Sequence, residues 1–354
     1  MAKIDQLFQS VLEKDASDLH LSQGQPPKMR VHGAIKEMDE AILTEDSLCE
    51  YLEEICTDAH WDRFKDTGDL DFAYALGDET RFRCNYYKHV NGHGAIFRMI
   101  PNELLTIEKL GLPEVLTTFS DLNSGLVLVT GPTGSGKSTT LAAIIGHINS
   151  HHAKHILTVE DPIEFLHHNI KSVVVQREVG IDVDSFDSAL LDAAHGDYDV
   201  ILVGEMRDLE TIKLAISAAE AGNLVFATLH TNSAAKTIDR IIDVFPGDEQ
   251  PQIRTMLSES LKGVVSQSLL KRKNGEGRVA ACEILLHTRA LAGIIRDGGA
   301  LNKLHSVMMS GRCMGMQIMD DVIEHYYYDG LIGGHEAYMK ALDKDRFEQI
   351  RDNT

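Results

Sequence analysis

The chain contains 354 residues, 43% of them hydrophobic, and this length predicts about two domains of ordinary size. Its formal net charge is −20, and even with all 17 histidines protonated it would be −20 + 17 = −3. Because nucleic-acid binding requires a basic surface, this balance disfavours a nucleic-acid partner and favours a nucleotide or a protein.

The compartment follows from features that the sequence lacks. No apolar run approaches the roughly 18 residues of a membrane-spanning helix, and residues 1–6 have neither the basic start nor the apolar stretch of a signal peptide. The five cysteines are odd in number and form no CxxC pair. This usage predicts reduced, mostly buried thiols, and the spacings give no argument for a structural zinc. We therefore expect a soluble cytosolic protein that is free to dock on a membrane complex.

Residues 1–100 are predicted to form a small α+β domain. The expected elements are a helix over 5–14 with Leu7, Phe8, Val11 and Leu12 inward, a strand from Leu19, a turn at 24–27, and a helix over 45–56 that Thr44 caps and that carries Leu48, Leu52 and Ile55 on one face.

A hairpin of two strands is expected over 81–88 and 95–100, with its turn near Val90. This register places Arg83 and Arg98 opposite each other on one face. Two neighbouring cations are unfavourable unless an anion lies between them or each pairs with its own carboxylate. The sequence of the hairpin leaves both interpretations open.

Residues 101–112 are predicted to be a linker, and residues 113–354 a second domain. Strands and helices alternate there, and the strands are continuously apolar, which is typical of a parallel α/β sheet covered on both faces. The expected strands are 126–130, 156–160, 173–176, 200–204 and 224–229, the clearest helices are 137–149 and 209–221, and after residue 246 helices are expected over 248–270 and from 290, 301 and 317.

The strongest motif is a phosphate-binding loop, or P-loop, at residues 131–139. The pattern GxxxxGK[ST] follows an apolar strand and opens a helix, which is the context that the motif requires. Backbone N–H groups and the helix N-terminus would bind phosphates, Lys137 would neutralise them, and the Ser138 hydroxyl would bind Mg²⁺. The predicted nucleotide-binding residues are Gly131, Pro132, Thr133, Gly134, Ser135, Gly136, Lys137, Ser138 and Thr139, with Ser138 also the metal ligand.

Acidic and basic side chains follow three other strands. Glu205 directly follows the apolar run 200–204 and is a candidate to polarise the attacking water. The alternative is that Glu205 is an acid at the start of the next helix. Glu160 and Glu164 belong to an acidic cluster that a magnesium nucleotide would stabilise, although the cluster taken by itself favours an ordinary solvated turn. His230 could sense the γ-phosphate or a neighbouring subunit, or simply be a packed, hydrogen-bonded residue.

Four histidines, His147, His151, His152 and His155, include an HxxxH spacing. They would offer two metal ligands on one helix face if the helix continues past residue 150. A solvated helix end is the simpler interpretation, and we favour it.

Taken in order, these motifs resemble those of the type IV pilus retraction (twitching motility, PilT-type) ATPases of the secretion-ATPase superfamily. The similarity extends over nearly the whole chain. It rests on residues 16–21 with 24–27 (an N-terminal signature), 160–165 (an aspartate box), 204–208 (a Walker B strand end with Glu in place of Asp), 228–232 (a histidine box) and 258–265.

The resemblance implies a hexameric ring of chains with a RecA-like ATPase domain and a PAS-like N-terminal domain. In such a ring Arg83 and Arg98 would stabilise charge at the ATP site, while Glu164 would help Glu205 to orient water. The implied substrate is ATP with Mg²⁺. The implied partners are a pilus platform protein at the inner membrane and other pilus ATPases, which would place the protein in the cytoplasm at that membrane. The absence of paired CxxC ligands and of an extra N-terminal region favours the retraction branch over the assembly branch.

Five positions depart from the family pattern. Leu191 and His195 replace arginines, Asn223 replaces a histidine, and Ala292 and Gly293 replace an arginine and an asparagine. We therefore consider an ATP-binding, weakly hydrolysing paralogue that regulates an active motor beside the hydrolysing motor itself. A RecA-like nucleic-acid motor is a third hypothesis, which the acidic balance opposes.

Overall fold

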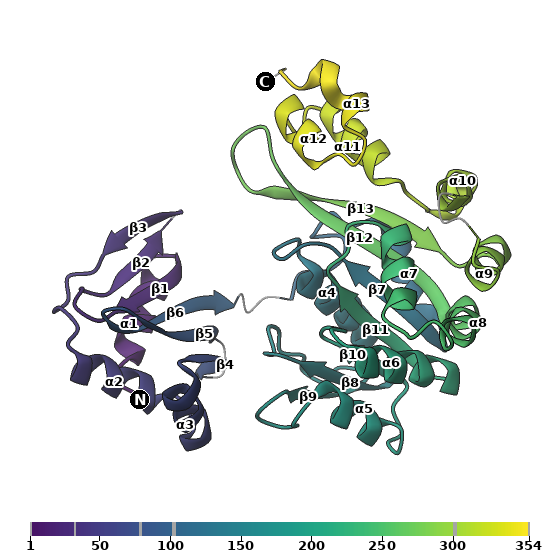
Figure 1. Cartoon of the computed structure of the whole chain (residues 1–354). Coiled ribbons are helices and arrows are strands. Elements are labelled where there is room, and N and C mark those ends of the chain that lie inside the picture. Colours follow the sequence, from purple (N-terminus) through teal and green to yellow (C-terminus); the bar gives the residue numbers. More distant parts are fainter. Residues whose placement is uncertain (1, 32, 78–79, 101–103, 300–302, 353–354) are drawn as a thin grey trace. The chain divides into compact units, whose positions relative to one another are not determined.

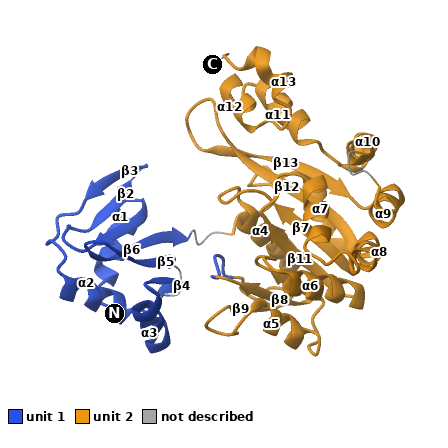
Figure 2. Ribbon diagram, viewed as in Figure 1, with its two compact units in different colours: residues 1–103, 162–166 blue, residues 104–161, 167–354 orange. Residues whose placement is uncertain are grey.

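The structure is a computed structural model that describes residues 2–31, 33–77, 80–100, 104–299 and 303–352. The chain divides into two compact units (Figure 2). Unit 1 contains residues 1–103 and 162–166, and unit 2 contains residues 104–161 and 167–354.

Unit 1 is built on an antiparallel sheet of strand order β3-β2-β1-β6-β5-β4 (Figure 1). Its elements are α1 (Asp5–Glu13), β1 (Ala16–Ser22), β2 (Lys28–Val31), β3 (Ala34–Glu37), α2 (Glu45–Glu54), α3 (Asp58–Thr67), β4 (Asp69–Leu76), β5 (Thr80–His89) and β6 (Gly92–Ile100).

The alternation predicted for the hairpin places its apolar side chains in the core of unit 1. Phe82 on β5 stacks on Phe8 of α1 with ring centroids 4.3 Å apart, and Tyr86 donates its hydroxyl hydrogen to the Leu52 carbonyl at 3.0 Å. One inward prediction is wrong: Leu12 is 37% exposed. The buried stripe of α1 follows residues 4, 7, 8 and 11, so Leu12 falls at its edge.

Unit 2 is built on a sheet of strand order β13-β12-β7-β11-β10-β8-β9, parallel except for β13 (Figure 1). Its elements are η1 (Glu114–Asp121), β7 (Gly125–Thr130), α4 (Lys137–His151), β8 (His155–Glu160), β9 (Val173–Glu178), α5 (Phe186–Ala193), β10 (Val200–Val203), α6 (Leu209–Ala221), β11 (Leu224–Leu229), α7 (Ala234–Asp243), α8 (Gln250–Ser260), β12 (Leu261–Lys271), β13 (Arg278–Leu286), α9 (Arg289–Arg296), α10 (Leu304–Ser310), η3 (Arg312–Met314), α11 (Met319–Tyr328), α12 (Gly334–Lys340), α13 (Lys344–Phe347) and η4 (Glu348–Ile350).

Helices cover both faces of this sheet, as the continuous apolar strands predicted. One core cluster joins α4 and η1 to the sheet, and the other joins helices of the 186–310 region to its opposite face. All residues of β7, β10 and β11 are buried. The edge strand β9 differs from that prediction, because its Val173 is 54% exposed.

The helix predicted over 248–270 is wrong beyond residue 260. Leu261–Lys271 is instead the strand β12, parallel to β7 and antiparallel to β13. The apolar run is compatible with either structure, and pairing with β7 decides between them. Gly263 permits the close packing, since a Cβ there would lie 2.6 Å from the Phe119 ring.

The structure differs from the linker prediction over 101–112 in the part of it that is described. Residues 101–103 lie outside the described residues, and residues 104–112 belong to unit 2. The reason is apolar burial: Ile107 and Leu112 are 2% and 7% exposed in the cluster that contains α4.

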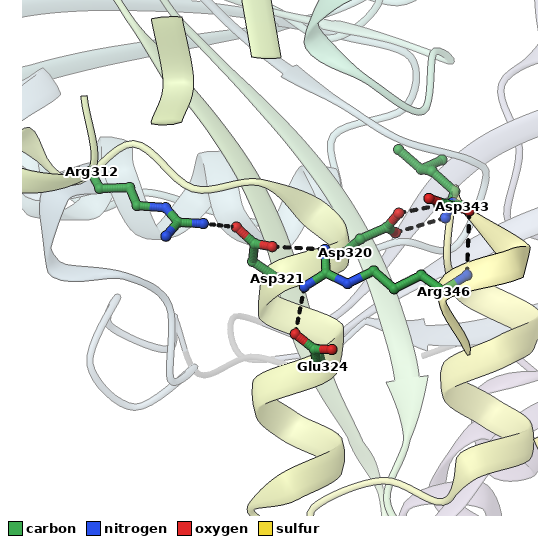
Figure 3. A network of polar contacts seen from close by, with 7 residues as sticks. Arg312, Asp320, Asp321, Glu324, Asp343 and Arg346 are labelled. Atoms are coloured by element: carbon green, nitrogen blue, oxygen red, sulfur yellow. Dashed lines mark hydrogen bonds and ion pairs between the residues drawn. The ribbon is translucent and has the colours of Figure 1, made fainter. Parts of the chain in front are cut away.

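The C-terminal helices α11, α12 and α13 pack in a small apolar cluster that also includes Leu270 of β12 and Ala281 of β13. An ion-pair network links η3, α11 and α13: Asp321 contacts both Arg312 and Arg346, and Arg346 also contacts Glu324 (Figure 3). Residue 301, where a helix was predicted to begin, lies outside the described residues. The described helix in this region is α10. Among the described residues, no helix is long and apolar enough to cross a membrane.

Candidate functional site

The P-loop turns sharply between the end of β7 and the start of α4. Gly131, Gly134 and Gly136 have φ values of 146°, 75° and 89°, which favour glycine. At Gly131 a Cβ would also lie 2.3 Å from the Gln267 carbonyl oxygen and 2.5 Å from Ser135 Oγ. These glycines therefore allow a tight backbone cradle that a larger residue would fill.

The cradle has the donors that a phosphate requires. Gly136 is the N-cap of α4 and provides no side-chain hydrogen bond, so the first N–H groups of the helix remain for a ligand. Lys137 Nζ donates to the carbonyl oxygens of Gly131 at 2.9 Å and Pro132 at 3.2 Å, which holds the ammonium beside the loop. The buried Ser135 hydroxyl has no hydrogen-bond partner within the described part of the chain. This arrangement fits a polyphosphate, and the Ser138 hydroxyl next to Lys137 is the group that would hold Mg²⁺.

Gln267 on β12 supports the P-loop from the neighbouring strand. Its Nε2 donates to the Ser135 carbonyl at 2.8 Å, and its Oε1 accepts from Thr140 Oγ1 at 2.7 Å. Residues on both sides of Lys137 are thereby tied to the sheet. Sequence reasoning missed Gln267 because it placed the residue in a helix; the only signal was a polar residue inside an apolar run.

Replacing Gln267 by Leu should weaken this support. The substitution leaves a buried hydroxyl and a buried carbonyl without a partner, which costs about 1–3 kcal/mol for each such group. We expect a lower free energy of unfolding in denaturant titration and a weaker affinity for MgATP. Gln252→Leu, at an exposed position of α8, is the matched control, and equal behaviour of the two variants would contradict the assignment.

The strand order brings the predicted residues of unit 2 to one edge of the sheet. The P-loop follows β7, His230 follows β11, Glu205 follows β10 and Glu160 ends β8 (Figure 1). These four strands are consecutive neighbours and parallel. Their carboxyl ends therefore meet on the side where ligands bind in open α/β sheets.

Glu205 is held by two partners. His230 Nε2 lies 2.9 Å from Glu205 Oε1, and Arg207 Nη2 lies 2.9 Å from Glu205 Oε2. The carboxylate side chain is only 22% exposed. Arg207 also lies 3.8 Å from Asp161, so it links the ends of β10 and β8. Sequence reasoning did not identify Arg207, although an arginine two residues after the acid was a signal for it.

Glu160 is oriented toward its own strand and β9. Its Oε1 accepts hydrogen bonds from Thr158 Oγ1 at 2.8 Å and Gln176 Nε2 at 3.3 Å. Glu160 and Glu205 thus lie on neighbouring strands, each held by its own set of donors.

Arg83, Arg98 and Glu164 belong to unit 1. The predicted register is confirmed, because Arg83 and Arg98 are directly paired across β5 and β6. Each arginine meets carboxylates of its own: Arg83 lies 3.5 Å from Glu164, and Arg98 lies 2.8 Å from Asp18. The alternative of separate pairing is therefore what the structure contains. Burial raises the pKa of Asp18, but hydrogen bonds from Ser17 and Arg98 outweigh it and bring the pKa below its usual value.

A cavity of about 350 Å³ lies beside the P-loop and could hold a flat heterocycle. Its lining combines apolar side chains with a few polar groups: Leu110, Leu112, Gly136, Thr139, Thr140, Gln267, Leu269, Gly277, Arg278 and Ala280. The segment that was expected to be linker contributes two of these residues.

The histidine cluster provides fewer metal ligands than its HxxxH spacing would allow. Helix α4 does continue to His151, and the rings of His147 and His151 stack with centroids 4.1 Å apart. Over the described ranges, however, no group of three or more His, Cys, Asp or Glu residues could hold a metal ion.

A parallel α/β sheet with a P-loop on β7 and a carboxylate at the end of β10 defines a RecA-like P-loop ATPase. The profile of the family described as Type II/IV secretion system protein matches residues 1–326, and the chain belongs to that family.

Its relatives include two curated proteins and one solved structure. The chain is 47% identical to the type IV pilus retractation ATPase PilT of Pseudomonas aeruginosa, over 97% of this chain and 99% of that protein. It is 44% identical to a twitching motility protein of Neisseria gonorrhoeae, over 90% of this chain and 85% of that protein. The crystal structure of the pilus retraction motor PilT with bound ADP matches with a TM-score of 0.89 and 41% identity, over 99% of this chain and all (100%) of that one.

Proposed function

We propose that this protein is an ATP-hydrolysing motor that powers retraction of a type IV pilus. The observation that carries the proposal is the P-loop cradle with Glu205 at the same edge of the sheet. The pilus part rests on the 47% identity to a protein named as a retraction ATPase.

In this proposal the residues of unit 2 divide the work. The backbone of 131–139 and Lys137 bind the phosphates, and the cavity beside Gly136 takes the base. Ser138 holds Mg²⁺, which supplies charge neutralisation on the phosphates when it is bound. Glu205 accepts a hydrogen bond from the attacking water, and His230 keeps that carboxylate in place. Glu160 would contribute a carboxylate at the same edge of the sheet for a magnesium nucleotide.

The residues of unit 1 would act through an assembled ring. We propose a homo-hexamer in which Arg83 and Arg98 stabilise the charge of the transferred phosphoryl group and Glu164 assists Glu205. An arginine in this role contributes roughly 10³–10⁵-fold to the rate. The proposed partner is a pilus platform protein, with the ring in the cytoplasm at the inner membrane and other pilus ATPases nearby.

ATP turnover and native mass, measured on one preparation, test the proposal. The expected result is magnesium-dependent phosphate release by a particle of six chains. No affinity for MgATP would overturn the ATPase assignment. Hydrolysis by a monomer would instead contradict the proposed hexameric ring.

No contact among the described residues of the site supports the hypothesis of a weakly hydrolysing paralogue. Leu191 and His195 are exposed on or just after α5, and Ala292 and Gly293 lie on α9, whereas the P-loop and Glu205 are intact. Binding of MgATP with negligible turnover would nevertheless favour that alternative.

The role of Arg98 can be separated from its ion pair with Asp18. If Arg98 acts on the nucleotide, Arg98→Ala should lower kcat by at least about 10³-fold, the lower end of the range for such residues, while Asp18→Asn should keep most of the activity. If the arginine serves only the pair, both variants should lose activity and thermal stability together. Steady-state ATPase kinetics with thermal unfolding distinguish the two outcomes.

A further inference from the structure

The turn that carries His230 leads directly into helix α7. Residues 230–233 connect β11 to Ala234, the first residue of that helix. His230 contacts Glu205 and lies only four residues before the start of α7. The position of the first residue of α7 therefore affects the position of the imidazole relative to the carboxylate. A residue that fixes the start of α7 therefore acts on the site without touching it.

Glu283 of β13 fixes that start. Its side chain is buried, since the residue is 4% exposed, and its Oε1 accepts a hydrogen bond from the Ala234 N–H at 2.7 Å. The backbone N–H of Met319, the first residue of α11, also acts to lower the pKa of this carboxyl. One carboxylate thus lies at the N-termini of two helices, where the helix dipoles favour negative charge. Burial raises the pKa of Glu283, and the two N–H donors oppose that shift.

Helix α7 is also linked to the P-loop strand, through the buried side chain of Thr237. Its Oγ1 donates to the Ser233 carbonyl at 2.8 Å and shares a hydrogen bond with Thr231 Oγ1 at 2.6 Å. The same hydroxyl lies 3.5 Å from Thr130 Oγ1, at the last residue of β7. Movement at the start of α7 would therefore be felt both by the turn after His230 and by the strand before the P-loop.

We propose that Glu283 is a positioning residue for ATP hydrolysis, which holds the N-terminus of α7 and through it the contact between His230 and Glu205. The inference rests on the proposed function for its reaction. It adds a connection from β13 to the site, because Glu283 holds the start of α7 by its hydrogen bond to Ala234.

Asp320 provides a matched comparison for Glu283. It is also buried, at 7% exposed, and its two oxygens accept from the backbone N–H groups of Leu342 at 2.7 Å and Asp343 at 2.8 Å (Figure 3). It therefore ties C-terminal elements together as Glu283 does, but it makes no bond to α7. Loss of Asp320 reports the effect of loosening the C-terminal helices while the hydrogen bond between Glu283 and Ala234 stays in place.

The experiment compares the full-length variants Glu283→Ala, Glu283→Gln and Asp320→Ala. We expect Glu283→Ala to lower kcat about tenfold while the affinity for MgATP stays within about twofold of wild type. Glu283→Gln retains one carbonyl acceptor and should recover part of the rate. Asp320→Ala should lower the thermal unfolding temperature and leave kcat near wild type. Hydrogen exchange of residues 231–238 should accelerate in Glu283→Ala only.

Two results would overturn the inference: unchanged kcat and exchange in folded Glu283→Ala, or an equal loss of kcat in Asp320→Ala. If Glu283→Ala does not fold, Glu283→Asp replaces it, because the shorter side chain keeps the charge but cannot reach both N–H groups. Unchanged kcat in Glu283→Asp would then contradict the inference. Should wild-type protein hydrolyse no ATP, the proposed function fails, and hydrogen exchange alone still decides whether Glu283 positions α7.

Discussion

Glu205→Gln should reduce kcat for ATP hydrolysis by roughly 10²–10⁴-fold, the range typical of a lost general base. Affinity for MgATP should stay close to wild type, because Glu205 binds no phosphate in the proposed mechanism. The neutral amide keeps the size of the side chain but is a far weaker acceptor for the proton of an attacking water. Steady-state turnover together with equilibrium nucleotide binding measures both quantities.

The expected loss is specific to this carboxylate and its surroundings. Glu205 has donors on both oxygens, His230 and Arg207, so an amide there would also direct an N–H group toward one of them. Glu210→Gln is the control, because Glu210 is exposed in the first turn of α6. If Glu205→Gln turns over ATP normally, water activation must be assigned to another residue.

Lys137→Ala should weaken MgATP binding by roughly 10- to 150-fold, because a hydrogen bond to a charged group contributes about 1.5–3 kcal/mol net. Hydrolysis at low ATP concentration should fall at least in proportion. The ammonium now bonds to the carbonyl oxygens of Gly131 and Pro132, so it is already placed within the loop that would surround the phosphates. Titration with a fluorescent ATP analogue measures the change in affinity.

Lys213→Ala controls for the loss of one positive charge. Lys213 lies on α6, is 48% exposed and has Glu249 as a distant partner at 4.0 Å, so its removal should leave nucleotide affinity unchanged. Equal weakening in the two variants would point to a general charge effect, and retained binding in Lys137→Ala would contradict the placement of phosphates in the P-loop.

Much of the site could be read from the sequence because it is built from local segments. The P-loop, Glu205 and His230 each end a strand whose apolar run is visible in the chain, and parallel strands bring such ends together whatever the details of packing. The opposition of Arg83 and Arg98 was also predictable, since hairpin register follows from the length of the turn.

Other residues could not be found in this way, because their partners are distant in the chain. Gln267 bonds to Ser135 across 132 residues and Glu283 bonds to Ala234 across 49. Gln267 lies on β12, inside the stretch 248–270 where a helix was expected, and Glu283 lies on β13. The separate carboxylate partners of Arg83 and Arg98 likewise come from segments that no local pattern connects to them.

The sequence by itself determined the class of protein, the loop that binds phosphates and the strands that carry the acid and the histidine, because periodicity and motif spacing act over a few residues. Only the tertiary structure decided that 261–271 is a strand, that 104–112 packs on unit 2 and that a buried glutamate joins two helix ends. These features depend on burial and on hydrogen bonds between distant segments, and such contacts stabilise one of several locally acceptable conformations.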